Sequence, residues 1–249
     1  MSIPKTSEQI SKHKKDAIST LDILLDKYII SNPKKADILS YWLEDYSRFL
    51  DCESDFNPKH LKRYKRGEII KANLGFNIGS EEGGLHYCVV IEKNNPQSSP
   101  VLTVIPLTSS KSTDKKQYAG QVFIGNDLKN KVEDKCNMLI KKAYEKFSNT
   151  AKIVEDFSNG EISIESAEID NTTIEEIKQF LKALESAEKV YNEANRMKAG
   201  SIALVNQITT ISKIRVYDPK TNKDILSNIR LSDESLNKID AEIKKLFTY

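Results

Sequence analysis

A chain of 249 residues, of which 39% are hydrophobic and 30% charged, has the size and composition of one large folded domain or two small ones. Its formal net charge is only +2, so any surface for a polyanion must be local. The sequence has no run of eighteen apolar residues and no apolar signal core, which predicts a cytoplasmic protein that makes no contact with a membrane.

Metal and cofactor chemistry have little support in the sequence. The three cysteines and three histidines are scattered, without a C-x-x-C pair and without histidines at the spacing of helical ligands. The glycine-rich signatures of nucleotide-binding loops and the nucleophile elbow of hydrolases do not occur either. We therefore expect no metal, no cofactor and no disulfide.

Residues 7–54 have the periodicity of two helices. Apolar side chains recur along both segments at helical spacing. Asn32 followed by Pro33 is typical of a helix start, because asparagine caps the first turn and proline fits its first position. This pattern predicts an N-terminal helical arm over residues 1–61.

Short runs of β-branched residues replace the helical period after the arm. Residues 67–74, 85–91, 101–107 and 121–124 are such runs, each bounded by turn residues. They predict a β meander. Four glycines in residues 75–84, between the first two runs, would let the backbone approach a ligand closely.

Helical periodicity returns over residues 126–198. Apolar residues mark one helix from Leu128 to Phe147 and another from Ile174 to Tyr191. We therefore expect a helical hairpin here.

The strand pattern resumes after Gly200, and Ser232 has the position of a cap for a closing helix. The sequence thus predicts an α+β protein whose β domain, residues 62–125 and 199–249, is split by a helical-hairpin insertion at residues 126–198.

Two blocks of sequence carry a family resemblance. The first contains Lys65-Arg-Gly-Glu-Ile-Ile, Gly79-Ser-Glu-Glu-Gly-Gly-Leu-His-Tyr-Cys-Val-Val-Ile and Ile105-Pro-Leu-Thr. The second contains Gly200-Ser-Ile-Ala-Leu-Val-Asn-Gln-Ile-Thr-Thr-Ile-Ser-Lys and then Leu231-Ser-Asp-Glu. In order and spacing these motifs resemble the MazF/PemK family of ribonuclease toxins from type II toxin-antitoxin systems.

The resemblance implies a small SH3-like β-barrel of the MazF/PemK/CcdB type, usually a homodimer with a groove for single-stranded RNA. It also implies an endoribonuclease that needs no metal. The ribose 2′-hydroxyl attacks the adjacent phosphorus and leaves a 2′,3′-cyclic phosphate and a 5′-hydroxyl. A cognate antitoxin protein is expected to hold such an enzyme inactive.

Three candidate catalytic residues follow from the same resemblance. Thr108 matches a threonine that ends a strand in the family, and Glu81 matches an acidic residue of the glycine-rich motif. His86 stands where the family has an arginine. A histidine can serve there as acid or base, since an imidazole exchanges protons near neutral pH. Arg66 and Arg215 are candidates for replacing the family arginine.

Residues 59–120 contain ten basic and five acidic side chains, a local balance of +5. Candidates for RNA binding in and around this segment would supply hydrogen bonds, positive charge or a stacking ring. They are Lys65, Arg66, Tyr87, Ser109, Ser110 and Lys111.

Other interpretations remain open at this point. His86 could be a strand histidine whose ring bonds a backbone carbonyl, and Cys88 is expected to pack in the core rather than act as a nucleophile. The chain could also be a catalytically silent binding module, acting on a protein partner as a gyrase poison does, or on nucleic acid. The arm could inhibit the site or serve dimerisation, and the insertion could dock the antitoxin, extend the dimer or thicken the fold.

Overall fold

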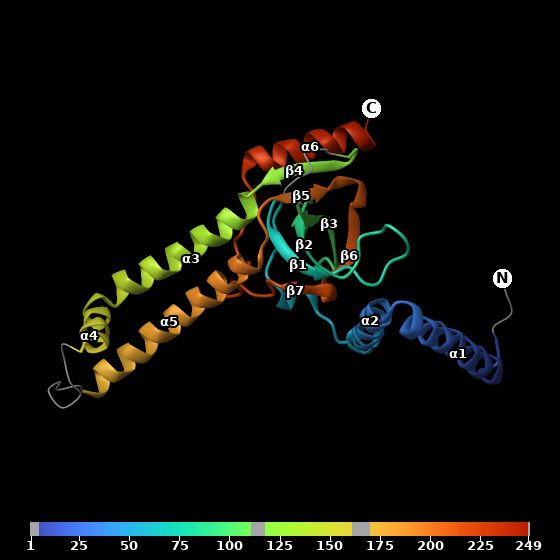
Figure 1. Cartoon of the computed structure of the whole chain (residues 1–249), viewed down its shortest axis with the longest axis horizontal. Coiled ribbons are helices and arrows are strands. Elements are labelled where there is room, and N and C mark those ends of the chain that lie inside the picture. Colours follow the sequence, from blue (N-terminus) through green and yellow to red (C-terminus); the bar gives the residue numbers. More distant parts are fainter. Residues whose placement is uncertain (1–4, 111–117, 161–169, 249) are drawn as a thin grey trace. The chain divides into compact units, whose positions relative to one another are not determined.

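The computed structural model describes residues 5–110, 118–160 and 170–248 (Figure 1). These residues form six α-helices and one antiparallel sheet of seven strands. The α+β class expected from the sequence is confirmed.

The chain divides into two compact units. The first consists of residues 1–56 and the loop 75–84, and the second of all the remaining residues. Residues 57–61, which the sequence assigned to the arm, are grouped with the second unit, where the side-chain amide of Gln97 donates to the carbonyls of Lys59 and Leu61 at 2.9 and 2.5 Å.

The first unit contains two helices, α1 (Ser7–Ser31) and α2 (Pro33–Cys52). Thr6 forms a capping box at the start of α1, and the side chain of Asn32 accepts a hydrogen bond from the backbone N–H of Lys35 at the start of α2. The two helices predicted from the periodicity are therefore present, and the second starts at the Asn-Pro pair.

The sheet of the second unit has the strand order β4-β5-β3-β2-β1-β7, with β6 paired to β3 as well. The strands are β1 (Ile69–Asn73), β2 (Leu85–Val90), β3 (Val101–Ser109), β4 (Gln121–Gly125), β5 (Ser201–Leu204), β6 (Thr209–Ser212) and β7 (Val216–Asp218).

The long strand β3 organises this sheet. One of its edges pairs with β2, and the other pairs with β6 near its start and with β5 near its end. The pairings of the described strands leave β4 and β7 as two open edges, so the sheet is not closed. The closed SH3-like barrel implied by the resemblance is not confirmed by these pairings.

The insertion contains three helices, α3 (Asp127–Lys146), α4 (Ser148–Ser158) and α5 (Asn171–Arg196). Figure 1 shows α3 and α5 running side by side away from the sheet, with α4 at the far end. The far end has a small apolar cluster of its own around Phe147 and Phe180. The short helix α4 interrupts the simple hairpin expected from periodicity.

The near end of the hairpin shares the core of the sheet. Val132 of α3 and Val190 of α5 belong to the same buried cluster as Ile69, Val89 and Ile105 of the strands. The expected insertion is thus continuous with the β domain in its packing. This sharing fixes the last turn of α5 against the sheet.

A final helix, α6 (Asp233–Phe247), lies beside β4 (Figure 1). Ser232 caps its first turn as expected, and Leu236 and Ile239 bury its apolar face in the main core. None of the helices in the described part of the chain is long and apolar enough to cross a membrane.

Candidate functional site

A pocket of about 230 Å³ opens where β2 begins, where β3 ends and where the chain passes from α5 to β5. It brings together four residues that the sequence singled out, namely His86, Tyr87, Thr108 and Ser109, with others that it did not. Its lining consists of Leu85, His86, Tyr87, Leu107, Thr108, Ser109, Leu128, Arg196, Met197, Lys198, Gly200 and Ser201.

His86 and Thr108 occupy facing positions on neighbouring strands. β2 and β3 are antiparallel with Tyr87 opposite Leu107, so the same register continued by one residue sets His86 opposite Thr108. Side chains at facing positions of an antiparallel pair project from the same side of the sheet. The strand pairing therefore supports a joint action of these two residues on one ligand.

The ring of His86 is oriented by a backbone carbonyl. Its Nδ1 lies 3.3 Å from the oxygen of Leu107. An Nδ1–H that donates to this carbonyl leaves the lone pair on Nε2, which is the tautomer that a general base needs. The carbonyl contact expected of a plain strand histidine is thus present, and it is also compatible with base chemistry.

The end of β3 forms the rim of the pocket. Thr108 is half-buried opposite Ile202, and Ser109 is exposed opposite Ser201. The backbone N–H of Ser110 donates to the carbonyl of Gly200 at 3.0 Å. Both serine candidates are therefore at or next to the rim.

Lys111, which the sequence also singled out, lies outside the described residues.

Tyr87 faces the opposite side of β2 and is held by α5. Its hydroxyl donates to Oε1 of the buried Glu193 at 2.5 Å, and Nζ of Lys71 lies 2.8 Å from the same oxygen. The Lys71 ammonium also stands 5.2 Å from the centre of the Tyr87 ring. Sequence reasoning missed Glu193 because nothing in the pattern of a charged helix separates it from its neighbours.

This network sets the protonation states of its members. Burial, followed by the hydrogen bond to Glu193 and by the charge of that carboxylate, raises the pKa of Tyr87 well above its ordinary 10.0. Burial acts to raise the pKa of Glu193, but the hydrogen bonds from Lys71 and Tyr87 outweigh it, so that this pKa lies below its ordinary 4.5. Tyr87 therefore stays neutral and Glu193 stays ionised at neutral pH.

Two cations from the insertion complete the lining. Arg196 is the last residue of α5, and Lys198 follows it in the link to β5. Both are exposed, and one guanidinium nitrogen of Arg196 lies 3.8 Å from Oε2 of Glu193. Among the described residues of the lining there is no carboxylate, so both of these charged side chains are positive. The sequence could not reveal these cations, since they lie about 90 residues after Thr108 along the chain.

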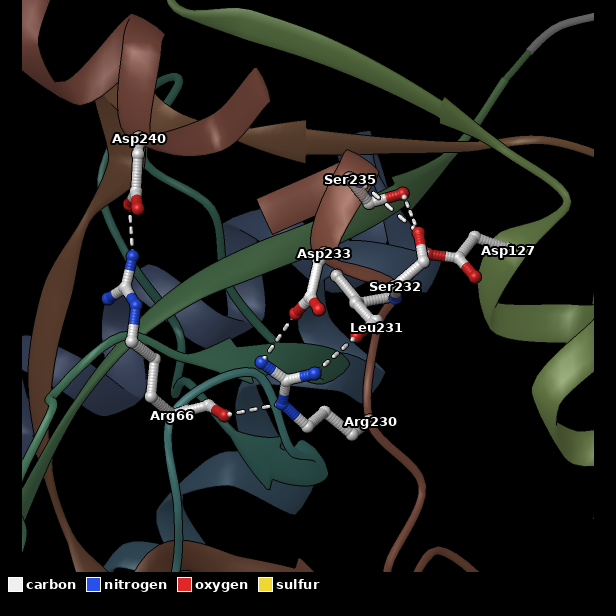
Figure 2. A network of polar contacts seen from close by, with 8 residues as sticks. All are labelled: Arg66, Asp127, Arg230, Leu231, Ser232, Asp233, Ser235 and Asp240. Carbon is white, nitrogen blue, oxygen red and sulfur yellow. Dashed lines mark hydrogen bonds and ion pairs between the residues drawn. The ribbon is translucent and has the colours of Figure 1, made fainter. Parts of the chain in front are cut away.

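Arg66 and Lys65 lie elsewhere on the second unit. The guanidinium of Arg66 donates to the carbonyl of Ile91 and pairs with Asp240 of α6 (Figure 2). Ile91 directly follows β2, five residues after His86, which is about 16 Å in an extended chain. Lys65 is exposed, and its backbone N–H donates to Glu68 at 3.0 Å.

Figure 2 shows that Arg66 is one part of a network at the start of α6. Its carbonyl accepts from Arg230 at 3.2 Å, and Arg230 pairs with Asp233 at 2.9 Å. Ser232, the cap of α6, donates to Asp127 of α3 at 2.8 Å through both its backbone and its hydroxyl. These contacts join α6 to the rest of the unit. Arg66 therefore has a structural role in them.

Two further candidates are placed by local contacts. Glu81 belongs to the first unit, where its exposed carboxylate accepts from the backbone N–H of Ile78 at 3.4 Å within the glycine-rich loop. Arg215 precedes β7, and its Nε donates to the carbonyl of Asn73 at 2.7 Å.

The cysteines and the possible metal ligands offer no second site among the described residues. Cys88 is fully buried, as expected of a core residue. Within the described ranges, no group of three or more histidine, cysteine, aspartate or glutamate side chains could hold a metal ion.

Comparison with known families agrees with the first block of resemblance. The family model described as "PemK-like, MazF-like toxin of type II toxin-antitoxin system" matches residues 65–154. This range contains His86 and Thr108 and ends in α4. The resemblance to that family is therefore confirmed over these residues, whereas the second block, from Gly200 onward, lies outside the match. No curated protein matches the chain.

Proposed function

With the match to PemK-like, MazF-like toxins as the premise, we propose that this protein is a toxin-type endoribonuclease that cuts single-stranded RNA without a metal. One observation carries the proposal. The pocket combines an oriented imidazole, a threonine hydroxyl on the facing strand and two cations, and no carboxylate stands among the lining residues that the structure describes. This is a set of groups suited to a phosphodiester anion.

The chemistry proposed for this pocket is transesterification within the RNA chain. Nε2 of His86 takes the proton of the ribose 2′-hydroxyl as the 2′-oxygen bonds to phosphorus. The bond from phosphorus to the 5′-oxygen breaks, and that oxygen leaves with a proton from water. The products are a 2′,3′-cyclic phosphate and a 5′-hydroxyl. The hydroxyl of Thr108 donates to a phosphate oxygen during the step.

The remaining parts of the proposal derive from the resemblance. They are a homodimer built on an SH3-like barrel, a groove for RNA at its interface, and a cognate antitoxin that covers this groove. Glu81 and Tyr87 are proposed to act on bound RNA, Glu81 from the glycine-rich loop and Tyr87 with its ring. The exposed end of β3, with Ser109 and Ser110, would contact the backbone of the same strand of RNA.

Cleavage of a long single-stranded RNA in EDTA tests the proposal. We expect the wild type to leave cyclic-phosphate and 5′-hydroxyl ends, with a rate optimum near neutral pH if an imidazole is the base. His86→Ala should lower the rate roughly 100-fold or more, the usual effect of losing a positioned acid or base. Thr108→Ala should lower it about tenfold, as for a lost hydrogen bond to a charged group.

Matched variants control for the loss of each residue type. His60→Ala removes an exposed histidine of the same unit, and Thr103→Ala removes a threonine of the same strand, whose hydroxyl lies 3.2 Å from that of Thr210. Both controls should cut at the wild-type rate. A folded wild type that shifts the mobility of RNA without cutting it would replace the nuclease with the silent binding module.

A further inference from the structure

We infer that Arg196 and Lys198, at the end of α5, bind the phosphate groups of the substrate, so that the helical insertion completes the site begun by the strands. The inference rests on the proposed function for the identity of the substrate, a single-stranded RNA. It adds two residues that lie outside the family match.

The charge of the pocket favours an anion. Among the lining residues that the structure describes, Arg196 and Lys198 are the only lysine, arginine, aspartate or glutamate side chains. A phosphodiester carries one negative charge and accepts hydrogen bonds at two unesterified oxygens. A planar guanidinium matches such a pair of oxygens, and an ammonium adds a compact charge beside it. These two cations are therefore complementary to the charge and the oxygens of a phosphate group.

The backbone that carries the two cations is fixed in position. Met197, between the two cations, is 8% exposed and belongs to the main core. One turn earlier, Glu193 is bound by Lys71 and Tyr87. The backbone N–H of Gly200 donates to the side chain of Asn126 at 2.7 Å. The chain is thus held on both sides of Arg196 and Lys198, while their side chains extend into solvent at the pocket.

Arg196 makes one long ion pair within the protein. A guanidinium nitrogen lies 3.8 Å from Oε2 of Glu193, and the Arg196 side chain is 76% exposed. Lys71 and Tyr87 both donate to the other oxygen, Oε1, so Glu193 keeps two hydrogen bonds when Arg196 binds a ligand. By contrast, the guanidinium groups of Arg66, Arg215 and Arg230 each donate to a backbone carbonyl.

A purely structural role for Arg196 is the alternative to RNA binding. A cation in the last turn of a helix interacts favourably with the helix dipole. That role would leave RNA binding unchanged when the side chain is removed, so experiment can separate the two roles.

The test measures binding of a 2′-O-methyl single-stranded oligonucleotide, which lacks the attacking hydroxyl, across a series of salt concentrations. Arg196→Ala and Lys198→Ala should each weaken binding roughly tenfold at low salt. Each should also reduce the slope of log affinity against log salt by about 0.7, the share of one phosphate contact on a single strand. Arg196→Lys should recover the slope.

Lys178→Ala is the matched control. Lys178 lies on α5 as well, its side chain is 68% exposed, and its Nζ lies 3.8 Å from a glutamate three residues earlier. The variant loses the same charge from the same helix, at a distance from the pocket. It should bind RNA as the wild type does.

Cleavage by the same variants separates this inference from the proposed function. If the wild type cuts RNA and Arg196→Ala and Lys198→Ala bind and cut as Lys178→Ala does, the phosphate-binding pair is overturned and the nuclease stands. If the wild type binds the oligonucleotide through both cations but cuts no RNA, the nuclease fails and the pair stands. If both hold, cleavage should fall about tenfold or more in each cation variant.

Discussion

The carboxylate of Glu193 links α5 to two strands of the sheet. It lies on α5, and it accepts from Lys71 of β1 and Tyr87 of β2. A buried carboxylate is costly unless it is paired and hydrogen-bonded, and here both conditions are met. The residue therefore fixes the helix end that carries Arg196.

Replacement of Glu193 by glutamine should make the free energy of unfolding less dependent on pH in the acidic range. The pKa of this carboxyl lies below its ordinary 4.5 in the folded protein. Its ionised form therefore contributes stability that is fully present above about pH 4.5 and is lost as the pH falls through the lower, folded-state pKa. Glu193→Gln should cost about 2 kcal/mol at pH 7, and the difference from the wild type should shrink below pH 4.5.

Urea unfolding at pH values from 3 to 7 measures this difference. Glu188→Gln, an exposed carboxylate of the same helix, is the control and should change little. A constant difference between wild type and Glu193→Gln over the whole range would show that ionisation of Glu193 contributes nothing.

The link between α5 and β5 is the element that shapes the pocket. It leads from Arg196, the last helical residue, to Ser201, the first residue of β5. Gly200 has φ of +76° there, a left-handed conformation that glycine adopts without strain. Its carbonyl accepts from Ser110 at the rim. A short link with this turn lets the insertion place two cations beside the strand ends.

Gly200→Ala should destabilise the protein and weaken the pocket. An added Cβ would lie 3.0 Å from Cβ of Ser110 and 3.2 Å from the ring of Phe123, in a conformation that alanine adopts poorly. We expect a loss of about 1–3 kcal/mol in unfolding free energy. Gly160→Ala is the control because Gly160 has the same φ of +76°, with no atom of the described residues within 4 Å of the added carbon.

Thermal unfolding of both variants separates contact from backbone strain. The loss in Gly160→Ala reports the left-handed backbone alone, so Gly200→Ala should lose more. Equal losses would mean that the neighbours of Gly200 yield without cost, and RNA cleavage by Gly200→Ala should then stay at the level of the wild type.

At the scale of the whole molecule, the main core belongs to one unit. Every residue of the cluster that holds strands, hairpin and α6 together lies outside residues 1–56 and 75–84. The first unit, by contrast, exposes apolar side chains such as Ile18 and Ile30 of α1, and α1 buries none of its residues. The stability of the second unit therefore rests on its own apolar burial.

A chain without residues 1–56 should fold and keep the pocket. We expect one cooperative unfolding transition in urea and RNA cleavage close to that of the full chain, because the pocket lining and the main core are both retained. A clear rise in cleavage after truncation would favour the arm as a tethered inhibitor. A truncated chain without a cooperative transition would show that the second unit needs the arm.

The sequence by itself determined the local elements and the strand residues of the site. Caps such as Asn32 and Ser232 act on their own first turns, and periodicity reports one face of one element, so both can be read without knowledge of distant contacts. His86 and Thr108 were found through the family resemblance, and the register of β2 and β3 sets them opposite each other.

The tertiary structure alone decided which charges meet at the pocket. Arg66 is near His86 in sequence, yet its guanidinium pairs with Asp240 beyond the end of β2. Arg196 is far away in sequence, yet it lines the pocket with His86. The physical reason is that an exposed cation carries no periodic or capping signal, and its partners are set by which helix end packs against which strand end.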